Sequence, residues 1–301
     1  MPPASPSPTV HVAVLNWNRE EDTTACLDSL LAQRGVDLRI LLVDNASTDG
    51  SGERLRARYS SICFLQTGAN LGYTGGNNRG IEWAQARDAE WVLVMNNDTV
   101  ADADCVRHLL DVAVAEPRVA ALAPLIVRYD DPERVWFAGG RHDRARAIGM
   151  HRHYGEPVRS VVAREETDAS RWQECSFLTG CCLLLRGAAL DEVGLFRDDY
   201  FAYGEDVELS IRLSRAGWRI GWVPTARIAH RVPAEGTPPT PRQIMLRDRN
   251  RRRLVREHYA GRWRIAFALW FWPTRLIHLA RYALAGDGDR ARAIVAGMRE
   301  P

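Results

Sequence analysis

Apolar and polar stretches alternate along the first 125 residues in the pattern of strands followed by helices. Short apolar runs rich in Val, Ile and Leu predict buried strands at 10–15, 39–43, 62–65, 91–95 and 119–123. The segments between them place apolar side chains at helical spacing, at 26–31, 54–59, 80–87 and 102–115. This alternation predicts an α/β fold in which a mostly parallel sheet is flanked by helices.

Three of the predicted strands end in polar clusters. These clusters are Asn16-Trp17-Asn18, Asp44-Asn45 and Asn96-Asn97-Asp98. A single polar strand end is usually a turn, but the carboxyl ends of parallel strands lie at one edge of a sheet, where open α/β folds bind their ligands. The three clusters together therefore predict a binding site at that edge.

The alternation ends after residue 125. Residues 130–170 mix charged residues with Gly and His, which indicates a long loop or a small antiparallel insert. Apolar residues return at 177–185, a helix is predicted at 205–216 and a strand at 219–223. Four prolines within 233–241 mark a hinge, and an Arg- and Trp-rich helical extension follows them.

Composition narrows the class of protein further. The chain has 301 residues, a formal net charge of +2 and forty basic residues, all of them Arg. Six cysteines without a CxxC pair argue against a disulfide framework or a zinc site, and for reduced thiols in a cytosolic protein. Residues 1–9 resemble a flexible leader rather than a signal peptide. No apolar run reaches the ~20 residues of a membrane span, since Pro273 stops the longest candidate, 265–272.

Two segments are candidates for binding a nucleotide. Asp44 is placed to accept hydrogen bonds from a nucleobase imide or from ribose hydroxyls, as acidic residues do in dinucleotide folds. The alternative for Asp44 is an Asx-turn through Asn45 and Ser47. Residues 70–80 hold four glycines, which allow backbone amides to approach a phosphate closely. This stretch matches neither GxGxxG nor the P-loop pattern, so a plain loop is its alternative.

Three carboxylates and one histidine are candidates for metal binding and proton transfer. Asp98 is a hard oxygen ligand suited to Mg²⁺ or Mn²⁺ but needs a partner, and His230 is either that partner or a structural histidine. Glu205 and Asp206 open the predicted helix at 205–216, where acidic residues complement the helix dipole. The same dipole keeps a carboxylate ionised near neutral pH, as a general base requires.

Seven segments, each weakly specific alone, occur together in the order of a known family. They are 15–18, 43–51, 70–80, 95–99, Thr179-Gly180, 203–209 and 226–230. Together they resemble the inverting, nucleotide-sugar-dependent glycosyltransferases of family two, which have the GT-A fold, a Rossmann-like sheet flanked by helices. The resemblance covers residues 10 to 231. It is closest to the rhamnosyltransferase-like branch, which also matches Arg249-Asn250 in the extension.

The resemblance implies a role for each candidate residue. A UDP- or dTDP-linked sugar donor would be bound by Asn16, Trp17, Asp44, Asn45, Asn70, Gly72, Tyr73, Gly76, Asn77, Asn96 and Asn97. Asp98 and His230 would hold Mg²⁺ or Mn²⁺ on the donor diphosphate. Asp206, with Glu205 beside it, would be the base that deprotonates an acceptor hydroxyl, so that the sugar is transferred in a single displacement with inversion. The chain departs from the family's DxD motif in having Asn96 at the first position.

The resemblance also implies a division of the chain. Residues 10–232 would form the GT-A catalytic domain, and 233–301 would be the hinge and the helical extension. Within the catalytic domain, 10–125 would bind the nucleotide sugar, and 126–232 would bind the acceptor and carry the catalytic base. The acceptor would be a glycan, a lipid-linked molecule or a small molecule with a free hydroxyl.

Two other classes of function remain open from the sequence. A sugar nucleotidyltransferase shares the sheet, the glycine stretch and the metal carboxylate, but should have a glycine-rich loop after its first strand, where 16–20 has no glycine. A non-catalytic protein would use the nine Arg of 242–264 to bind nucleic acid or a membrane. The Trp-rich segment 263–272 favours an anionic membrane surface over nucleic acid, and so a cytoplasmic protein in peripheral contact with the inner membrane face. Packing of the extension on the catalytic domain is the alternative.

Overall fold

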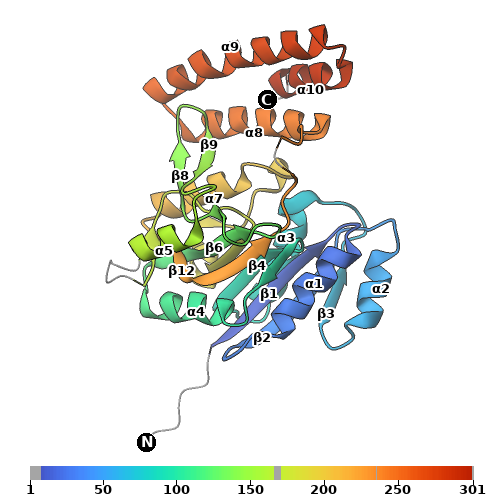
Figure 1. Cartoon of the computed structure of the whole chain (residues 1–301), viewed down its shortest axis with the longest axis vertical. Helices are drawn as coiled ribbons and strands as arrows, with labels where there is room; N and C mark the ends of the chain where they lie inside the picture. The colour runs from blue at the N-terminus through green and yellow to red at the C-terminus, as the bar shows by residue number, and fades with distance from the viewer. Residues whose placement is uncertain (1–7, 166–170, 235, 300–301) are drawn as a thin grey trace, which may run out of the picture.

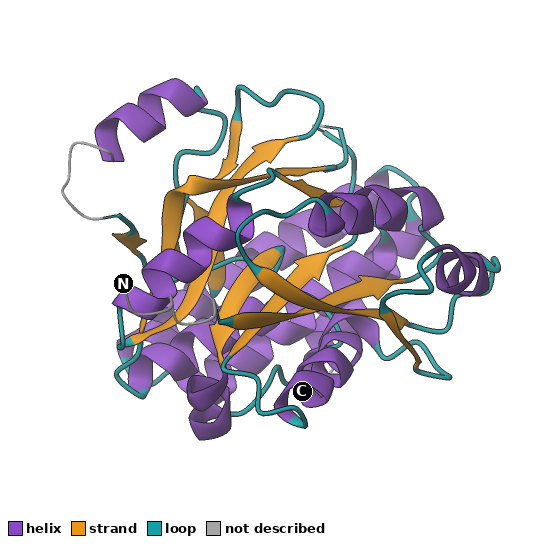
Figure 2. Cartoon of the chain, turned by 90° about the horizontal axis from the view of Figure 1, so that it is seen from below, coloured by secondary structure: helices purple, strands orange, loops and turns teal. Residues whose placement is uncertain are grey.

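A mostly parallel sheet runs through the centre of the molecule, with helices on both faces (Figures 1 and 2). The computed structural model describes residues 8–165, 171–234 and 236–299. Along the sheet, the strands lie in the order β10 (Gln173–Glu174), β12 (Arg219–His230), β6 (Val119–Arg128), β11 (Cys182–Arg186), β4 (Trp91–Asn96), β1 (Thr9–Asn16), β2 (Asp37–Asp44) and β3 (Cys63–Gln66). The sequence prediction of a mostly parallel α/β fold is confirmed.

The strands of the first half pair in parallel, and the inner three, β4, β1 and β2, are mostly buried on both faces. β4, β1, β2 and β3 are neighbours in that order, and all of their pairings are parallel. Consecutive residues from Trp91 to Met95 and from Ile40 to Asp44 are buried. Continuous burial explains why these strands appear in the sequence as uninterrupted apolar runs rather than as an alternation of apolar and polar residues.

From Gly72 onward, the glycine stretch at 70–80 is helical rather than the loop expected from its composition. The helices of the first half are α1 (Glu20–Leu31), α2 (Ser51–Arg58), α3 (Gly72–Gln85) and α4 (Cys105–Ala115). A Cβ added at Gly80 would lie 2.4 Å from the Cβ of Ala13, and one added at Gly76 would lie 2.4 Å from Leu15 Cδ1. The glycines therefore serve close packing of α3 on β1, which outweighs their low helix propensity.

The second half inserts short elements between the remaining strands of the sheet. They are β5 (Thr99–Ala101), β7 (Val135–Phe137), β8 (Gly140–Asp143), β9 (Ile148–His151), α5 (Val158–Glu165), α6 (Gly187–Val193), a 3₁₀ turn (Asp198–Tyr200) and α7 (Glu205–Arg215). β8 and β9 pair antiparallel, which confirms the predicted antiparallel insert in the described part of 130–170. The strand predicted at 219–223 continues to His230, because β12 resumes its pairing with β6 after an irregularity between Val223 and Arg227.

Three helices form a layer at the end of the molecule opposite the start of β1 (Figure 1). They are α8 (Pro241–His258), α9 (Arg262–Leu284) and α10 (Gly288–Arg299). α8 begins with a capping box between Thr240 and Gln243, with proline in its first turn. α9 runs through Pro273, which ends the apolar run of 265–272 but not the helix; Pro273 lies on the exposed side of the helix.

The structure bears on two sequence predictions, one about the cysteines and one about membrane-spanning segments. All six cysteines are free, and Cys26, Cys105, Cys181 and Cys182 are buried. Burial raises the pKa of the Cys26 thiol to about 12, which makes this sulfur unreactive near neutral pH. Among the described residues, no helix combines the length and the apolar character that a membrane span needs.

Candidate active site

The register of the parallel strands brings the predicted polar clusters together. Asn16, the last residue of β1, is paired with Asp44, the last residue of β2. Leu15 is paired with Asn96, the last residue of β4. The three strand ends therefore lie at one edge of the sheet, as the sequence predicted.

Asn16 and Asp44 form a buried hydrogen-bond network beneath this edge. Asn16 Nδ2 donates to Asp44 Oδ1 at 2.8 Å, and Asn16 Oδ1 accepts from the Thr23 hydroxyl at 2.8 Å. Asp44 also accepts from Gln66 Nε2 at 2.6 Å and from the Ser47 hydroxyl at 2.5 Å. Protein donors thus engage both carboxylate oxygens, and the network fixes the turn after β2. The role of Asp44 toward a nucleobase stays a prediction.

A cavity of about 430 Å³ opens above the strand ends, and we call it the donor-side cavity. It is lined by Leu15, Trp17, Arg19, Asn45, Asn70, Gly72, Tyr73, Asn96, Asn97, Asp98, Phe201, Ala202, Tyr203, Thr240, Arg242, Gln243 and Leu246. Asn45 fixes its floor, since its amide donates to the carbonyl of Gly72 at 3.0 Å and accepts from the Leu71 N–H at 2.9 Å. Gly76 and Asn77 do not line this cavity, because α3 directs Gly76 against β1 and Asn77 bonds to the Tyr73 carbonyl at 2.9 Å.

A second cavity, of about 510 Å³, adjoins the first; we call it the acceptor-side cavity. The two share Tyr73, Asn96, Ala202 and Tyr203 as lining residues. Its other walls come from Trp136, Ala147, Ile148, Gly149, His151, Phe177, Thr179, Gly180, Cys181, Gly204, Glu205, Asp206, Val207, His230, Arg247, Asn250, Arg251 and Leu254. The candidate donor residues and the candidate base therefore line neighbouring cavities with a common wall.

Asp98 and His230 meet where the two cavities adjoin. Asp98 lines the donor side and His230 the acceptor side, and His230 Nε2 lies 3.2 Å from Asp98 Oδ1. The pairing of β5 with β12 produces this contact, since Thr99 is paired with His230. The Trp136 ring packs against the imidazole in a T-shaped arrangement, with the ring centroids 4.6 Å apart.

The donor set of this pair fits a divalent cation. Asp98 Oδ1 is buried and receives no hydrogen bond from the described residues. A carboxylate oxygen facing an imidazole nitrogen suits Mn²⁺ or Mg²⁺, which bind proteins through few side chains and complete their shells with phosphate oxygens and water. No group of three or more His, Cys, Asp or Glu side chains within the described ranges is arranged to hold a metal. A cation here would therefore need ligands from a bound substrate.

Glu205 and Asp206 are the first two residues of α7, and their surroundings raise the pKa values of the two carboxyl groups to different extents. Burial raises the pKa of Asp206 to about 6, although hydrogen bonds from the N–H groups of Gly180, at 3.2 Å, and Val207, at 2.8 Å, oppose the rise. Burial, and then the charge of Asp206, raise the pKa of Glu205 well above its usual value. Near neutral pH Asp206 is therefore the ionised carboxylate of the pair, and Glu205 holds its proton to higher pH.

The loop that leads into α7 has an unusual backbone and is held by α8. Phe201 and Tyr203 have φ angles of 63° and 71°, which non-glycine residues rarely adopt. The Asn250 amide nitrogen lies 2.9 Å from the Tyr200 carbonyl oxygen and 2.7 Å from that of Tyr203. Because Asn250 is buried, its bonds keep these carbonyls satisfied and fix the loop in front of Glu205 and Asp206.

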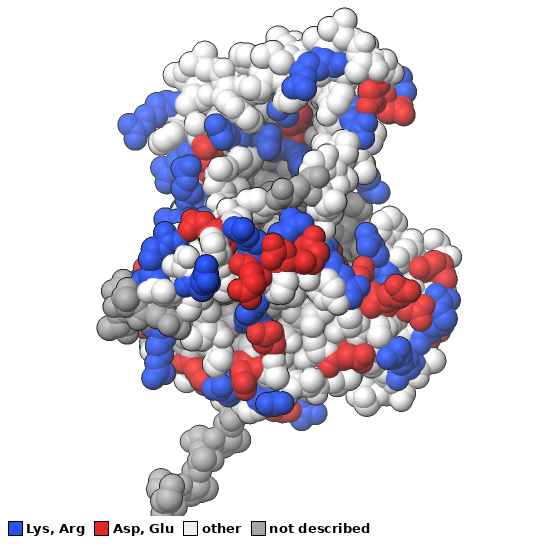
Figure 3. All heavy atoms as spheres, in the orientation of Figure 1, with Lys and Arg blue, Asp and Glu red and all other residues white. Residues whose placement is uncertain are grey.

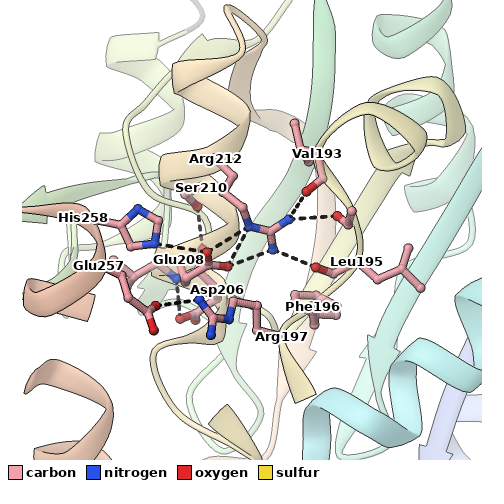
Figure 4. A network of polar contacts seen from close by, with 12 residues as sticks. Val193, Leu195, Phe196, Arg197, Asp206, Glu208, Ser210, Arg212, Glu257 and His258 are labelled. Carbon is pink, nitrogen blue, oxygen red and sulfur yellow. Dashed lines mark hydrogen bonds and ion pairs between the residues drawn. The ribbon is translucent and has the colours of Figure 1, made fainter. Parts of the chain in front are cut away.

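A buried ion network fixes the orientation of α7 (Figure 4). Glu208, 1% exposed, lies 2.8 Å from Arg212 and 3.1 Å from His258 at the end of α8. Burial alone would raise the pKa of Glu208, but hydrogen bonds from His258 and Arg212 outweigh it and leave the pKa below its usual value. The Arg212 guanidinium also bonds to the carbonyls of Val193 and Leu195. The network therefore ties α7, and with it Asp206, to α8 and to the turn after α6.

Comparison with known protein families identifies the family to which this chain belongs. The model of glycosyl transferase family 2 matches residues 11–194, more than half of the chain. The chain belongs to glycosyl transferase family 2.

Curated relatives of this glycosyltransferase share most of its length. It is 37% identical over 221 residues to an N-acetylglucosaminyl-diphospho-decaprenol L-rhamnosyltransferase of Mycobacterium tuberculosis, covering 67% of this chain and 68% of the relative. It is 27% identical over 227 residues to the galactofuranosyltransferase GlfT1 of Mycolicibacterium smegmatis, covering 73% and 70%. The rhamnosyltransferase-like resemblance is confirmed, and the enzyme class is glycosyl rather than nucleotidyl transfer.

Solved structures agree on the GT-A fold. A mannosyltransferase from Pyrobaculum calidifontis in complex with GDP-Man and Mn²⁺ superposes with a TM-score of 0.57 at 18% identity, covering 97% of this chain and 86% of the other. GalNAc-T7 with UDP, GalNAc and Mn²⁺ gives a TM-score of 0.59 at 16% identity, covering 77% of this chain and 45% of the other.

The candidate site includes residues that the sequence pattern did not indicate. α8 lines both cavities, with Arg242 and Gln243 on the donor side and Arg247 and Arg251 on the acceptor side. From its composition alone, this helix was expected to bind a membrane or nucleic acid, or to pack on the catalytic domain. The family resemblance included Arg249-Asn250 of this helix but gave the helix no part in the site. Trp136 and His151 lie in the irregular 130–170 segment, where no periodicity marked them.

Proposed function

We propose that this glycosyltransferase moves a sugar from a UDP- or dTDP-linked donor to an acceptor hydroxyl in a single displacement that inverts the anomeric carbon. The observation that carries the proposal is the pair of adjoining cavities, with Asp98 and His230 at their junction and Asp206 on the acceptor side. One displacement needs both substrates in place at once, and two cavities with a common wall provide for that.

On the donor side, we assign the nucleotide sugar to the cavity above the strand ends. Trp17 is 48% exposed at its rim and offers a flat surface for a base. Asn45 and Asn70 form the floor beside the N-terminus of α3, where the helix dipole favours an anion. Arg242 extends from α8 into the same cavity and supplies positive charge for a diphosphate. Asn16 and Asp44 support this floor from beneath, and Gly76 and Asn77 from within α3.

A divalent metal would be held by Asp98 and His230 and by the donor diphosphate. Such a cation supplies Lewis-acid stabilisation of the negative charge on the leaving diphosphate. The GalNAc-T7 and Pyrobaculum calidifontis mannosyltransferase structures, which share this fold, contain Mn²⁺, and this supports divalent-metal use here. Asn96 and Asn97, neutral at the first two positions of the motif, leave Asp98 as its one charged ligand.

On the acceptor side, Asp206 is assigned as the general base. Its carboxylate lies at the start of α7 and lines the cavity, and burial raises its pKa to about 6, close to the operating pH of a cytoplasmic enzyme. Glu205, which keeps its proton, adds no second negative charge beside the base. The proton of the acceptor hydroxyl passes to Asp206 as the oxygen attacks the anomeric carbon.

We further propose peripheral contact with the inner membrane face through α9, with a lipid-linked acceptor. Ile265, Leu269, Trp272 and Leu276 recur every three or four residues on one face of α9 and are 41% to 73% exposed. α9 contains Arg but no acidic residue, which favours anionic lipid. In Figure 3 the surface over α9 is mostly uncharged, with arginines beneath it. The rhamnosyltransferase relative, whose name places its acceptor sugar on diphospho-decaprenol, supports an acceptor of this kind.

Asp206→Asn tests the base. The substitution keeps the shape of the side chain but removes its proton affinity, so kcat should fall about 10²- to 10⁴-fold while the donor Kd stays unchanged. In the unsubstituted enzyme, kcat should rise with pH through about 6, because Asp206 must lose its proton to act. The matched control is Glu205→Gln, which should reduce kcat less. If Asp206 were only a helix cap, Asn would replace it almost silently, and near-normal transfer by Asp206→Asn would remove it from the mechanism.

Asp98→Ala and His230→Ala test the metal site. Each should weaken Mn²⁺-assisted binding of the donor diphosphate at least about tenfold, since each removes one of the two protein ligands. Calorimetry with UDP and dTDP, with and without Mn²⁺ or Mg²⁺, measures the effect. Asp131→Ala, at an exposed carboxylate outside both cavities, is the control and should bind normally. Unchanged metal enhancement in both site variants would contradict the assignment.

Leu269→Glu with Leu276→Glu tests membrane contact. Burying a leucine side chain is worth about 1.5–3 kcal/mol, so replacing two of them should reduce co-sedimentation with phosphatidylglycerol vesicles at least about tenfold. The control is Leu31→Glu, because Leu31 is 51% exposed on α1, in another part of the molecule. Equal sedimentation of the α9 variant and the unsubstituted protein, or no sedimentation of either at low salt, would refute the contact.

A further inference from the structure

Two arginines on α8 line two cavities at once. Arg247 and Arg251, one helical turn apart, belong to the wall of the acceptor-side cavity. They also line a smaller cavity of about 190 Å³ among α8, α9 and α10, together with Asp248, Arg275 and His278. These guanidinium groups therefore lie between the cavity that contains Asp206 and the helix whose apolar face is exposed.

The positive charge in this region exceeds the negative charge available to it. Among the residues that the structure describes, Asp248 is the one acidic residue lining the smaller cavity, and Arg275 lies 2.5 Å from its Oδ1. Arg251 is 3.8 Å from the same oxygen, too far for a hydrogen bond. Arg247 forms no ion pair or hydrogen bond with the described residues and lies over the Tyr203 ring at 4.7 Å. Two of the three guanidinium groups thus have unused N–H donors.

This imbalance distinguishes the pair from three other arginines of α8. Arg249 and Arg253 donate to backbone carbonyls of the 199–200 turn, and Arg252 donates to carbonyls at the end of α10. Those three serve packing of the extension. Burial lowers the pKa of Arg251 to about 10, and the nearby charges of Arg275 and Arg247 act in the same direction against the opposing charge of Asp248. An anion between Arg247 and Arg251 would relieve this repulsion.

We propose that Arg247 and Arg251 bind a phosphate or diphosphate group carried by the acceptor, while the acceptor's hydroxyl lies in the cavity with Asp206. The proposal rests on the proposed function and names its acceptor class. Guanidinium groups match phosphate because they offer paired N–H donors and keep their charge when partly buried. Tyr203, beneath Arg247, lines both the donor-side and the acceptor-side cavity. The anion would therefore lie beside the reacting centre and outside the donor-side cavity.

Binding of inorganic pyrophosphate, with the donor cavity saturated by UDP or dTDP, tests the site. Arg247→Gln, and its double variant with Arg251→Gln, should weaken pyrophosphate binding at least about tenfold, since charge-assisted hydrogen bonds to phosphate are lost. Arg256→Gln, on the same helix but outside the acceptor-side cavity and the smaller cavity, should bind pyrophosphate normally. Arg247→Lys should retain part of the affinity. Equal affinity in Arg247→Gln, its double variant and the unsubstituted protein, or no pyrophosphate binding at all, would overturn the proposal.

A second measurement separates the two sources of such a phosphate. Binding to phosphatidylglycerol vesicles should be unchanged by Arg247→Gln if the phosphate belongs to the acceptor. A loss of vesicle binding as large as the loss of pyrophosphate binding would assign the site to lipid headgroups and overturn the acceptor assignment. Asp206→Asn should bind pyrophosphate normally, so failure of the general base and failure of this anion site give different results.

Discussion

The parallel register of β1, β2 and β4 is the constraint on which the site depends. It sets Asn16 opposite Asp44 and Leu15 opposite Asn96, so that side chains distant in sequence meet at one edge of the sheet. The same sheet carries β5 and β12, whose antiparallel pairing places His230 beside Asp98. A shift of one residue in either pairing would turn these side chains to the opposite face. The chemistry of the site therefore follows from backbone hydrogen bonding before any substrate contact is considered.

The helical extension supplies the part of the candidate site that the sheet does not. α8 closes both cavities, holds the strained loop at 200–204 through Asn250, and joins α7 through the buried Glu208–His258 contact. One helix thus links the position of Asp206 to the face of α9 that we assign to the membrane. The arginines of α8 fall into two groups. Arg249, Arg252 and Arg253 donate hydrogen bonds to backbone carbonyls. Arg242 and Arg247 line the cavities instead.

The sequence predicted the parallel sheet and the meeting of its polar ends, because buried parallel strands and their polar termini leave a local pattern. It did not predict that 70–80 is helical, since the fit of Gly80 against Ala13 is a tertiary contact that overrides helix propensity. The walls from Trp136, His151 and α8 also escaped prediction, because their approach to the site depends on packing between distant segments. Asp98, His230 and Asp206 were candidates from the sequence with structural alternatives left open, and the family resemblance alone gave them their predicted roles.

The anomeric configuration of the product tests the central claim most directly. A single displacement, with Asp206 as base and no covalent enzyme intermediate, must invert the anomeric carbon of the donor sugar. Proton NMR of the first product formed from a donor of known configuration reads the outcome from the coupling at the anomeric proton. The account predicts a product of opposite configuration to the donor. A product with retained configuration would contradict it.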